Sequence, residues 1–396
     1  MLSCFSIPNY EKLLTNMKQK LAILVTFLLT NSLFSQKTVE AFPSEKLNET
    51  REITIITPDS YEGNKDKKYP LLVVLDGEFL LNPFYGVFSY GAYWDDLPEV
   101  IIVAINQNKN NEREYDTSYD DGGLPNEKGA KFFEFIGAEL VPYIEKKYRV
   151  APFRMIAGLD TTAGFLNFYL YKDNPLFNAY ISLSPELAPE METRIPERLG
   201  VIQKPIFYYQ ATSDADLKKI QTNMKALDEK AKALNNPNLK YRFDEFKGLS
   251  HYSLVTFAIP NAAYHIFDGY QPISTTEFQE KIAKMPTGHT QYLIDKYTNL
   301  EKKLGYKPTV RLNDFKAIEA AILKNKNYEE LLTLAELSKK NYPKSMISDY
   351  EKGLYYENTG DMKKAHKAYM SAFNMEPIGD LTKDGMLERA DAVKTR

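Results

Sequence analysis

RMIAGLDTTAG, residues 154–164, has the pattern of a buried strand that turns sharply into a helix. Residues 153–157 are a short, mostly apolar run, and a second apolar run with helical character covers residues 165–171. The residues between them have the spacing of the motif G-x-S-x-G, in which a nucleophile projects from the turn above a sheet. The central residue here is Asp160 instead of serine. The stretch therefore predicts the turn but not the usual nucleophile.

Strand and helix signals alternate on both sides of this turn. Residues 69–75 and 100–105 are continuous apolar runs of strand length, which is typical of strands buried on both faces. Further strands are expected at residues 52–57, 177–183, 204–210 and 239–246. Apolar residues spaced by threes and fours predict helices over residues 132–148 and 217–234. We therefore expect an α/β fold whose mostly parallel sheet has helices on both faces and sites at the carboxyl ends of its strands.

The C-terminal part of the chain has a different character, because it is helical and rich in lysine. Residues 348–377 fit the spacing of a tetratricopeptide repeat, in which small residues let two antiparallel helices approach, at Gly353, Tyr356, Gly360, Ala365, Tyr369, Ala372 and Pro377. Asp349 occupies the usual tryptophan position, and Pro343 marks a weaker copy one repeat earlier. We expect a helical linker over residues 273–310 and a small all-α tetratricopeptide-like domain over residues 311–396. Two repeats alone are marginally stable, so they should pack on the first domain or on a protein partner.

The N-terminus has the features of an export signal. From Met17 onward, two lysines precede the apolar residues 21–29, and a polar segment follows up to residue 35. We interpret residues 1–16 as an over-called extension and residues 17–35 as a signal peptide. The apolar core is too short for a permanent membrane span. The sequence therefore predicts an exported protein, either periplasmic or at the cell surface and secreted.

The composition argues against several classes of function. Lys and Arg number 50 against 53 Asp and Glu, and these charges are interspersed, so no nucleic-acid binding surface is expected. The only cysteine, Cys4, precedes the signal sequence, so the mature chain should have no disulfide. The histidines lack metal-ligand spacing, and we expect neither a metal nor a cofactor.

Seven segments have a specific resemblance to a known family. They are YPLLVVLDGE (69–78), PEVIIVAINQN (98–108), REYDT (113–117), ELVPYIEKKYRV (139–150), FRMIAG (153–158), SLSPEL (182–187) and SHYS (250–253). On these segments the chain resembles the putative esterase family, which includes siderophore esterases and carbohydrate acyl esterases. The resemblance implies an α/β-hydrolase fold over residues 36–272. Some bacterial members also carry tetratricopeptide repeats after the hydrolase domain.

The resemblance also implies roles for individual residues. Asp160 takes the nucleophile position, and His251 takes that of the general base. The acid that orients His251 is expected to be Asp214, with Asp216 as the second choice, although each could instead cap the helix that follows.

Further positions are expected to contribute an oxyanion hole and substrate contacts. Backbone N–H groups of Glu78 or Phe79 and of Thr161 would form the oxyanion hole. Arg113 and Asp116 match family positions that support loop structure or substrate contact. Trp94 ends the aromatic stretch FYGVFSYGAYW, which could line a pocket mouth, bind a sugar by stacking, or pack a loop over the turn.

The altered turn leaves three functions open. Where the family reads G-H-S-x-G-G, this chain reads GLDTTA from residue 158, so the histidine, the serine and both later glycines are absent. The favoured prediction is a degenerate esterase that binds a small acyl or carbohydrate ligand, or a protein partner through its repeats, without turnover. In the second, Asp160 is itself the nucleophile and His251 clears the ester with water, although a carboxylic ester would then give an unstable anhydride. In the third, another hydroxyl such as that of Thr161 or Thr162 sustains some esterase activity.

Overall fold

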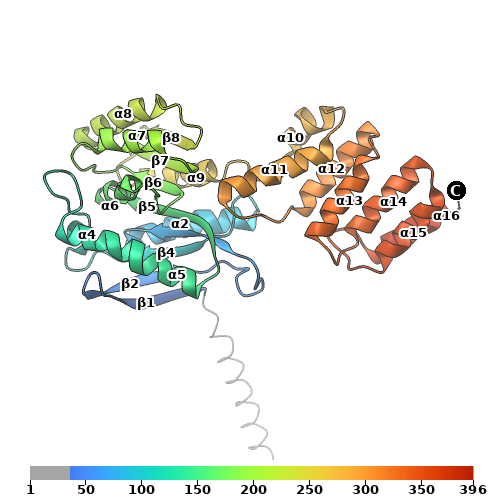
Figure 1. The fold of residues 1–396 in the computed structure, drawn as a ribbon, viewed down its shortest axis with the longest axis horizontal. Helices are drawn as coiled ribbons and strands as arrows, with labels where there is room; N and C mark the ends of the chain where they lie inside the picture. Colours follow the sequence, from blue (N-terminus) through green and yellow to red (C-terminus); the bar gives the residue numbers. More distant parts are fainter. Residues whose placement is uncertain (1–35, 396) are drawn as a thin grey trace, which may run out of the picture.

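The computed structural model describes residues 36–395, so the predicted signal peptide and Cys4 lie outside the described residues. The described chain forms an α/β region and a helical region, which lie side by side along the long axis of the molecule (Figure 1). None of the helices in residues 36–395 is long and apolar enough to cross a membrane.

An eight-stranded sheet in the order β1-β2-β4-β3-β5-β6-β7-β8 forms the centre of the α/β region. Its strands are β1 (Lys37–Ser44), β2 (Glu49–Ile56), β3 (Tyr69–Val74), β4 (Ile101–Ile105), β5 (Val150–Leu159), β6 (Ala179–Leu183), β7 (Ile206–Ser213) and β8 (Leu239–Phe246). Strands β3 to β8 are parallel, whereas β2 runs antiparallel to both β1 and β4. The expected mostly parallel sheet is confirmed. The edge strand β1 was not expected, because most of its residues are exposed and it has no apolar run.

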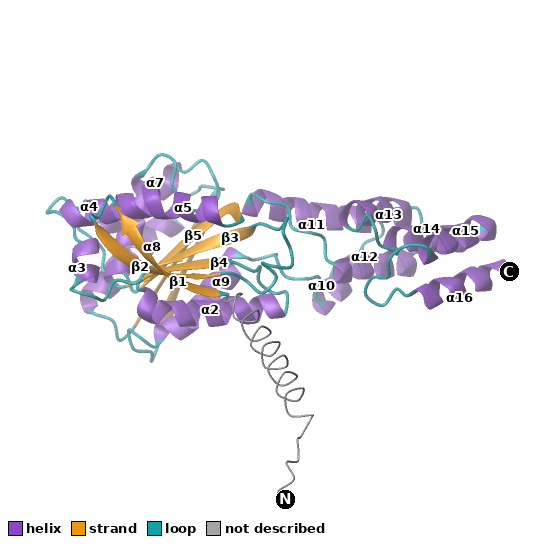
Figure 2. Ribbon diagram, turned by 90° about the horizontal axis from the view of Figure 1, so that it is seen from below, coloured by secondary structure: helices purple, strands orange, loops and turns teal. Residues whose placement is uncertain are grey.

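Helices cover both faces of this sheet (Figure 2). They are α2 (Gly77–Tyr93), α3 (Glu112–Asp116), α4 (Glu127–Glu134), η1 (Phe135–Leu140), α5 (Val141–Lys147), α6 (Thr161–Phe165), η2 (Leu166–Tyr171), α7 (Met191–Val201), α8 (Lys218–Lys232) and α9 (Leu254–Ile266). Leu71 and Val73 of β3 belong to the core under α4, α5, α7 and α8, whereas Leu72 and Val74 belong to the core under α2 and α9. Burial on both faces explains why β3 reads as an unbroken apolar run.

The helical region follows the sheet. It contains α10 (Thr275–Glu280), η3 (Ile282–Lys284), α11 (His289–Leu304), α12 (Leu312–Asn325), α13 (Glu330–Asn341), α14 (Ile347–Thr359), α15 (Met362–Phe373) and α16 (Lys383–Lys394). Gly353 of α14 lies directly against the ring of Tyr369 on α15, where a Cβ atom would collide with the ring. Gly360 ends α14 with a φ of 88°, a conformation that favours glycine. These glycines have the structural roles that the repeat pattern predicts, and the tetratricopeptide assignment itself remains a prediction.

The segment around α11 joins the two regions. Leu304 is buried in the sheet core under α2 and α9. Arg311 forms an ion pair with Asp95, which follows α2, and its guanidinium lies 4.2 Å from the centre of the Tyr270 ring. The helices therefore pack against the α/β region at the end of the molecule where α2 finishes.

A buried carboxyl group makes the stability of the helical region depend on pH. Glu351 is fully buried, its Oε2 accepts a 2.5 Å hydrogen bond from Ser338, and its Oε1 has no hydrogen-bond partner in the described structure. Burial raises the pKa of Glu351 well above its ordinary value. The folded protein therefore keeps a proton that the unfolded chain releases above about pH 4.5, so stability is lost as the pH rises above that value.

We expect Glu351→Gln to increase the free energy of unfolding by about 2 kcal/mol at pH 7 and to change it little at pH 4. Glutamine keeps the neutral, hydrogen-bonding shape without the cost of holding a proton. Urea unfolding at the two pH values measures both effects. Glu336→Gln on the exposed side of α13 is the matched control, and an equal gain in that variant would contradict the explanation.

Candidate functional site

Asp160 stands at the sharp turn between β5 and α6, with φ 59° and ψ −118°. Residues other than glycine rarely adopt such a conformation, and it persists only where the surrounding structure fixes it. The Asp160 N–H donates to the Leu183 carbonyl at 3.0 Å, and the Asp160 carbonyl accepts from the N–H groups of Gly164 and Glu186 at 2.9 and 3.0 Å. The structure thus has the turn where the sequence predicts it, with the aspartate at its tip.

Thr162 occupies the crowded position after the turn and is fully buried. Its hydroxyl accepts a hydrogen bond from the Leu159 N–H at 3.0 Å and donates to Asp76 Oδ2 at 2.6 Å. The hydroxyl is therefore committed to holding the turn and is not free to attack a substrate. The neighbouring Thr161 hydroxyl is also buried, and it has no hydrogen-bond partner among the described residues.

Arg113 connects three groups around the turn. Its Nε donates to Asp76 Oδ1 at 2.7 Å, its Nη2 donates to the Leu159 carbonyl at 2.8 Å, and its Nη1 lies 3.5 Å from Asp160 Oδ2. Burial raises the pKa of Asp76, and the bond from Arg113 opposes that rise. One guanidinium thereby offsets the charges of two carboxylates. Asp76 was missed from the sequence, although the Asp-Gly pair directly after the buried β3 run is a signal for it.

His251 lies in the loop between β8 and α9, with its Nδ1 2.7 Å from Asp216 Oδ1. The other oxygen of Asp216 accepts from the hydroxyls of Ser184 and Thr212 at 2.5 and 2.7 Å and from the Ser213 N–H at 2.8 Å. Burial alone would raise the pKa of Asp216, but the hydrogen bonds from His251, Ser184 and Thr212 lower it to about 2. The hydrogen bond to Asp216 in turn raises the pKa of His251. The contact with Asp216 fixes the orientation and the tautomer of the His251 imidazole, which a general base requires.

The expectation that Asp214 contacts His251 is wrong. Asp214 Oδ1 instead accepts from the Gly248 N–H at 2.9 Å and holds the loop after β8. The second choice, Asp216, makes the contact, because its buried carboxylate points among the hydroxyl donors at the ends of β6 and β7. Neither aspartate caps α8, whose N-terminus has no side-chain cap.

No hydrogen bond or ion pair joins the Asp160 carboxylate to the His251 ring in the described part of the chain. The negative charge of Asp160 nevertheless contributes to the raised pKa of His251. The two groups are therefore close enough to interact electrostatically without direct contact.

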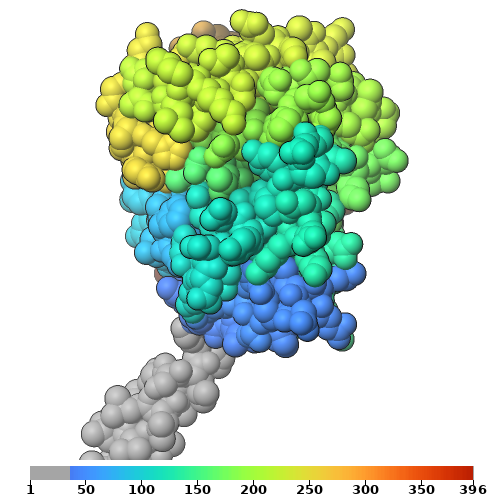
Figure 3. All heavy atoms as spheres, turned by 90° about the vertical axis from the view of Figure 1, so that its left-hand side faces the viewer, coloured from blue at the N-terminus to red at the C-terminus, as the bar shows by residue number. Residues whose placement is uncertain are grey.

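A cavity of about 600 Å³ lies beside the turn, a size suited to a small organic ligand. Arg113, Thr161, Phe165, Phe168 and Glu186 are among the residues that line it. The chain segments that line this cavity are coloured cyan to green in Figure 3 and meet on the face shown there. This face is at the end of the molecule away from the helical region. Polar groups from the turn thus meet apolar walls at the carboxyl edge of the sheet.

The oxyanion hole remains a prediction, and the structure shows how its expected residues are placed. The Phe79 N–H donates to the Asp76 carbonyl at 3.2 Å in the first turn of α2, so it is already committed. The Glu78 carboxylate accepts from the backbone N–H groups of Gln107 and Asn108 at 2.9 and 2.8 Å, which ties α2 to the loop after β4. Thr161 is the first residue of α6 and directly follows the turn, as expected.

Two of the three residues predicted to contact substrate are not among the described residues that line the cavity. Asp116 is fully buried, and its two oxygens each accept a 2.7 Å hydrogen bond from Arg51, so it cannot reach a ligand. Trp94 directly follows α2, whose 17 residues span about 25 Å from the end that carries Asp76. Only Arg113 lines the cavity, as predicted. Residues 36–395 contain no group of three His, Cys, Asp or Glu side chains that could hold a metal ion.

Comparisons with known proteins place this site in a family. Residues 44–254 match the family described as putative esterase. The crystal structure of an uncharacterised protein from Capnocytophaga ochracea is 31% identical, covers 91% of this chain and 100% of its own, and superposes with a TM-score of 0.82. That match extends well beyond the sheet and therefore includes most of the helical region. No curated protein matches the chain.

More distant structures show the fold alone. An IroE-like serine hydrolase from Shewanella oneidensis is 22% identical over 77% of this chain and 99% of its own, with a TM-score of 0.59. The BES protein from Bacillus cereus is 20% identical over 58% of this chain and 94% of its own, with a TM-score of 0.51. They agree with an α/β-hydrolase-like fold for the sheet and its helices.

The family match spans more than half of the chain and contains the turn at Asp160, the cavity beside it and the His251–Asp216 pair. The protein therefore belongs to the putative esterase family.

Proposed function

We propose that this protein is a catalytically degenerate esterase that binds a small ligand in the cavity beside Asp160 without hydrolysing esters. The observation that carries the proposal is the carboxylate at the tip of the turn, next to the guanidinium of Arg113. Attack of a carboxylate on a carboxylic ester gives an anhydride, which is less stable than the ester it replaces. The position that normally starts acyl transfer is thus unsuited to it.

The cavity suits a small acyl or carbohydrate ligand. Phe165 and Phe168 provide apolar walls, and the buried Thr161 hydroxyl provides a hydrogen-bonding group that no described residue uses. A ligand that bonded to this hydroxyl would remove the cost of leaving it unpaired. Such a pocket binds through shape and a few polar contacts, neither of which requires turnover.

The proposal also includes export and a protein partner. The signal pattern over residues 17–35 supports a periplasmic or cell-surface location. The repeat spacing over residues 348–377 supports a partner-binding role, because tetratricopeptide-like repeats commonly form binding surfaces.

A second candidate function is hydrolysis with Asp160 as the nucleophile. The His251–Asp216 pair favours this function. The Asp216 carboxylate takes part in four hydrogen bonds, one of which fixes the imidazole of His251. A general base requires such an imidazole, whereas ligand binding alone does not. In this reaction Asp160 would attack a substrate carbon that carries a good leaving group or belongs to a strained ring, and an ester would form as that group departs or the ring opens. His251 would then take a proton from the water that attacks the ester carbonyl, which releases the product alcohol and restores the Asp160 carboxylate.

We expect the purified chain of residues 36–396 to hydrolyse p-nitrophenyl acetate no faster than buffer does, because no serine stands at the turn. Spectrophotometric release of nitrophenol measures the rate, and Asp160→Asn is the matched variant of equal size. Ester hydrolysis that disappears in Asp160→Asn would disprove the binding proposal. Solvent oxygen-18 that appears in the Asp160 carboxylate after a single turnover of a substrate would establish the second candidate.

A further inference from the structure

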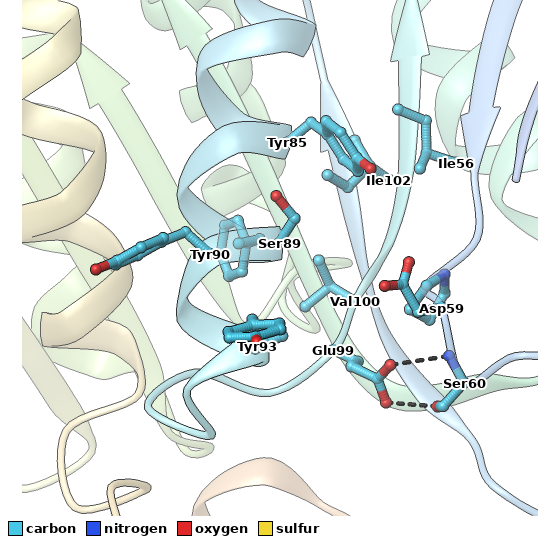
Figure 4. A pocket seen from close by; sticks show the side chains of 13 residues that line it. Ile56, Asp59, Ser60, Tyr85, Ser89, Tyr90, Tyr93, Glu99, Val100 and Ile102 are labelled. Carbon is cyan, nitrogen blue, oxygen red and sulfur yellow. Dashed lines mark hydrogen bonds between the residues drawn. The ribbon is translucent and has the colours of Figure 1, made fainter.

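A second cavity, of about 700 Å³, lies between the second half of α2, the end of β2 and the start of β4 (Figure 4). Ile56, Val100 and Ile102 form an apolar wall. Within residues 36–395, no residue lines both this cavity and the one beside Asp160. It is therefore a separate place at which a ligand could bind.

Aromatic rings from α2 form one side of this cavity. Tyr85, Ser89 and Tyr93 recur every four residues, so they project from the same side of the helix, as Figure 4 shows. The two tyrosines are 38% and 79% exposed, and neither hydroxyl bonds to another residue in the described structure. The Tyr93 ring meets the Trp94 ring edge to face at 5.1 Å. Exposed rings gathered at a cavity are uncommon in a soluble domain and typically mark a binding surface.

Carboxylates form the opposite rim. Glu99 accepts from the N–H and the hydroxyl of Ser60 at 3.1 and 2.5 Å and pairs with Lys67 at 2.5 Å, so its charge is offset and its position fixed. Asp59 is exposed and makes no hydrogen bond or ion pair with another described residue. None of the described residues that line the cavity is a lysine or an arginine. The rim therefore offers acceptors for hydroxyl groups and disfavours an anionic ligand.

We propose that this cavity binds a neutral oligosaccharide, whose sugar faces stack on Tyr85 and Tyr93 while Asp59 accepts hydrogen bonds from its hydroxyls. A sugar ring has an apolar face and hydroxyl groups around its edge. The cavity has matching groups, because its tyrosine rings can stack on the apolar face and its carboxylates can accept hydrogen bonds from the hydroxyls. Tyr85 and Tyr93 are eight positions apart, which separates them by about 12 Å along α2, a distance longer than one sugar ring. A compact cation would instead need several rings within about 6 Å of one point. The proposal is independent of whether the site at Asp160 is catalytic.

The test is a titration of residues 36–396 with maltohexaose and with cellohexaose. Isothermal calorimetry gives the affinity, and the emission of Trp94, the only tryptophan of the chain, reports binding next to Tyr93. We expect saturable binding of at least one hexaose. Tyr85→Ala and Tyr93→Ala should each weaken it at least about tenfold, whereas Tyr93→Phe should keep it because the stacking face remains.

The matched control is Tyr115→Ala, which removes a tyrosine of α3 that is 50% exposed and should leave the affinity unchanged. The absence of saturable heat for both sugars up to about 10 mM would overturn the proposal. So would binding that survives both Tyr85→Ala and Tyr93→Ala, since the sugar would then lie elsewhere. Both tyrosines are exposed side chains of one helix, so these variants should fold, and thermal unfolding verifies that they do.

Discussion

Asp160→Ser is expected to create ester hydrolysis, with kcat/KM for p-nitrophenyl butyrate at least about 100-fold above the wild-type chain. The strained turn is held by backbone hydrogen bonds that do not depend on the side chain at its tip. The His251 ring is already held by Asp216 and can act as the general base. Nitrophenol release under steady-state conditions measures the gain.

The pKa of His251 should govern the pH dependence of the new activity of Asp160→Ser. Asp216 is the main cause of the raised pKa of His251, and the charge of Asp160 adds to it. Removing the Asp160 charge lowers the pKa of His251 relative to the wild-type chain, so more of the imidazole is neutral at a given pH. We expect kcat/KM of Asp160→Ser to rise with pH and to level off above the pKa of His251.

Two matched variants show whether the new activity comes from the proposed groups. Asp160→Asn has the same size and no nucleophile, and Asp160→Ser combined with His251→Ala has the serine without its base; both should stay at the wild-type level. A gain of the same size in Asp160→Asn would mean that loss of the charge, and not the serine, is responsible. If a folded Asp160→Ser variant showed no gain in kcat/KM, the lack of ester hydrolysis would not be due to the absence of serine at position 160.

The fold could be predicted because burial leaves a strong pattern in the sequence. Strands β3 and β4 are covered on both faces and read as continuous apolar runs. β1 was missed for the opposite reason: it pairs on one side only, at the edge of the sheet, and most of its side chains face solvent. The turn at Asp160 was predictable because its flanking runs and Gly158 retain the spacing of the motif.

The site was less predictable because side-chain contacts between distant segments leave no local pattern. Asp214 and Asp216 follow β7 within three residues of its end, and only the fold decides which one faces Ser184 and His251. For Asp116 the sequence left support of loop structure and substrate contact open, and the buried contact with Arg51 of β2 favours the structural role. Arg51 lies 65 residues away in the sequence and leaves no signal near Asp116.

The replacements at the turn form one connected network. The Thr162 hydroxyl and the Arg113 guanidinium both bind the carboxylate of Asp76, and Arg113 also lies beside Asp160. The position that the family gives to glycine thus supplies a hydroxyl that helps to hold a buried aspartate. Asp160 and Thr162 are therefore best understood as parts of one remodelled site, joined through Arg113 and Asp76.

Asp116→Ala is expected to lower the free energy of unfolding by about 3–5 kcal/mol, the largest stability effect that we predict. The substitution leaves Arg51, which is 1% exposed, as a buried cation without its two 2.7 Å hydrogen bonds to Asp116. Glu49 stays within 2.6 Å of Arg51, which favours the lower end of that range. Urea unfolding monitored by circular dichroism at pH 7 measures the loss.

Replacing both partners separates the loss of the ion pair from the cost of a stranded charge. Arg51→Met combined with Asp116→Leu should recover most of the stability lost in Asp116→Ala, because no charge then remains without its partner. Glu114→Ala, which removes an exposed carboxylate from the same short helix, should change the free energy of unfolding by less than about 0.5 kcal/mol. If Asp116→Ala cost no more than Glu114→Ala, Asp116 would not be a structural anchor. The match of Asp116 to a family position would then need an explanation other than support of α3, the helix that also carries Arg113.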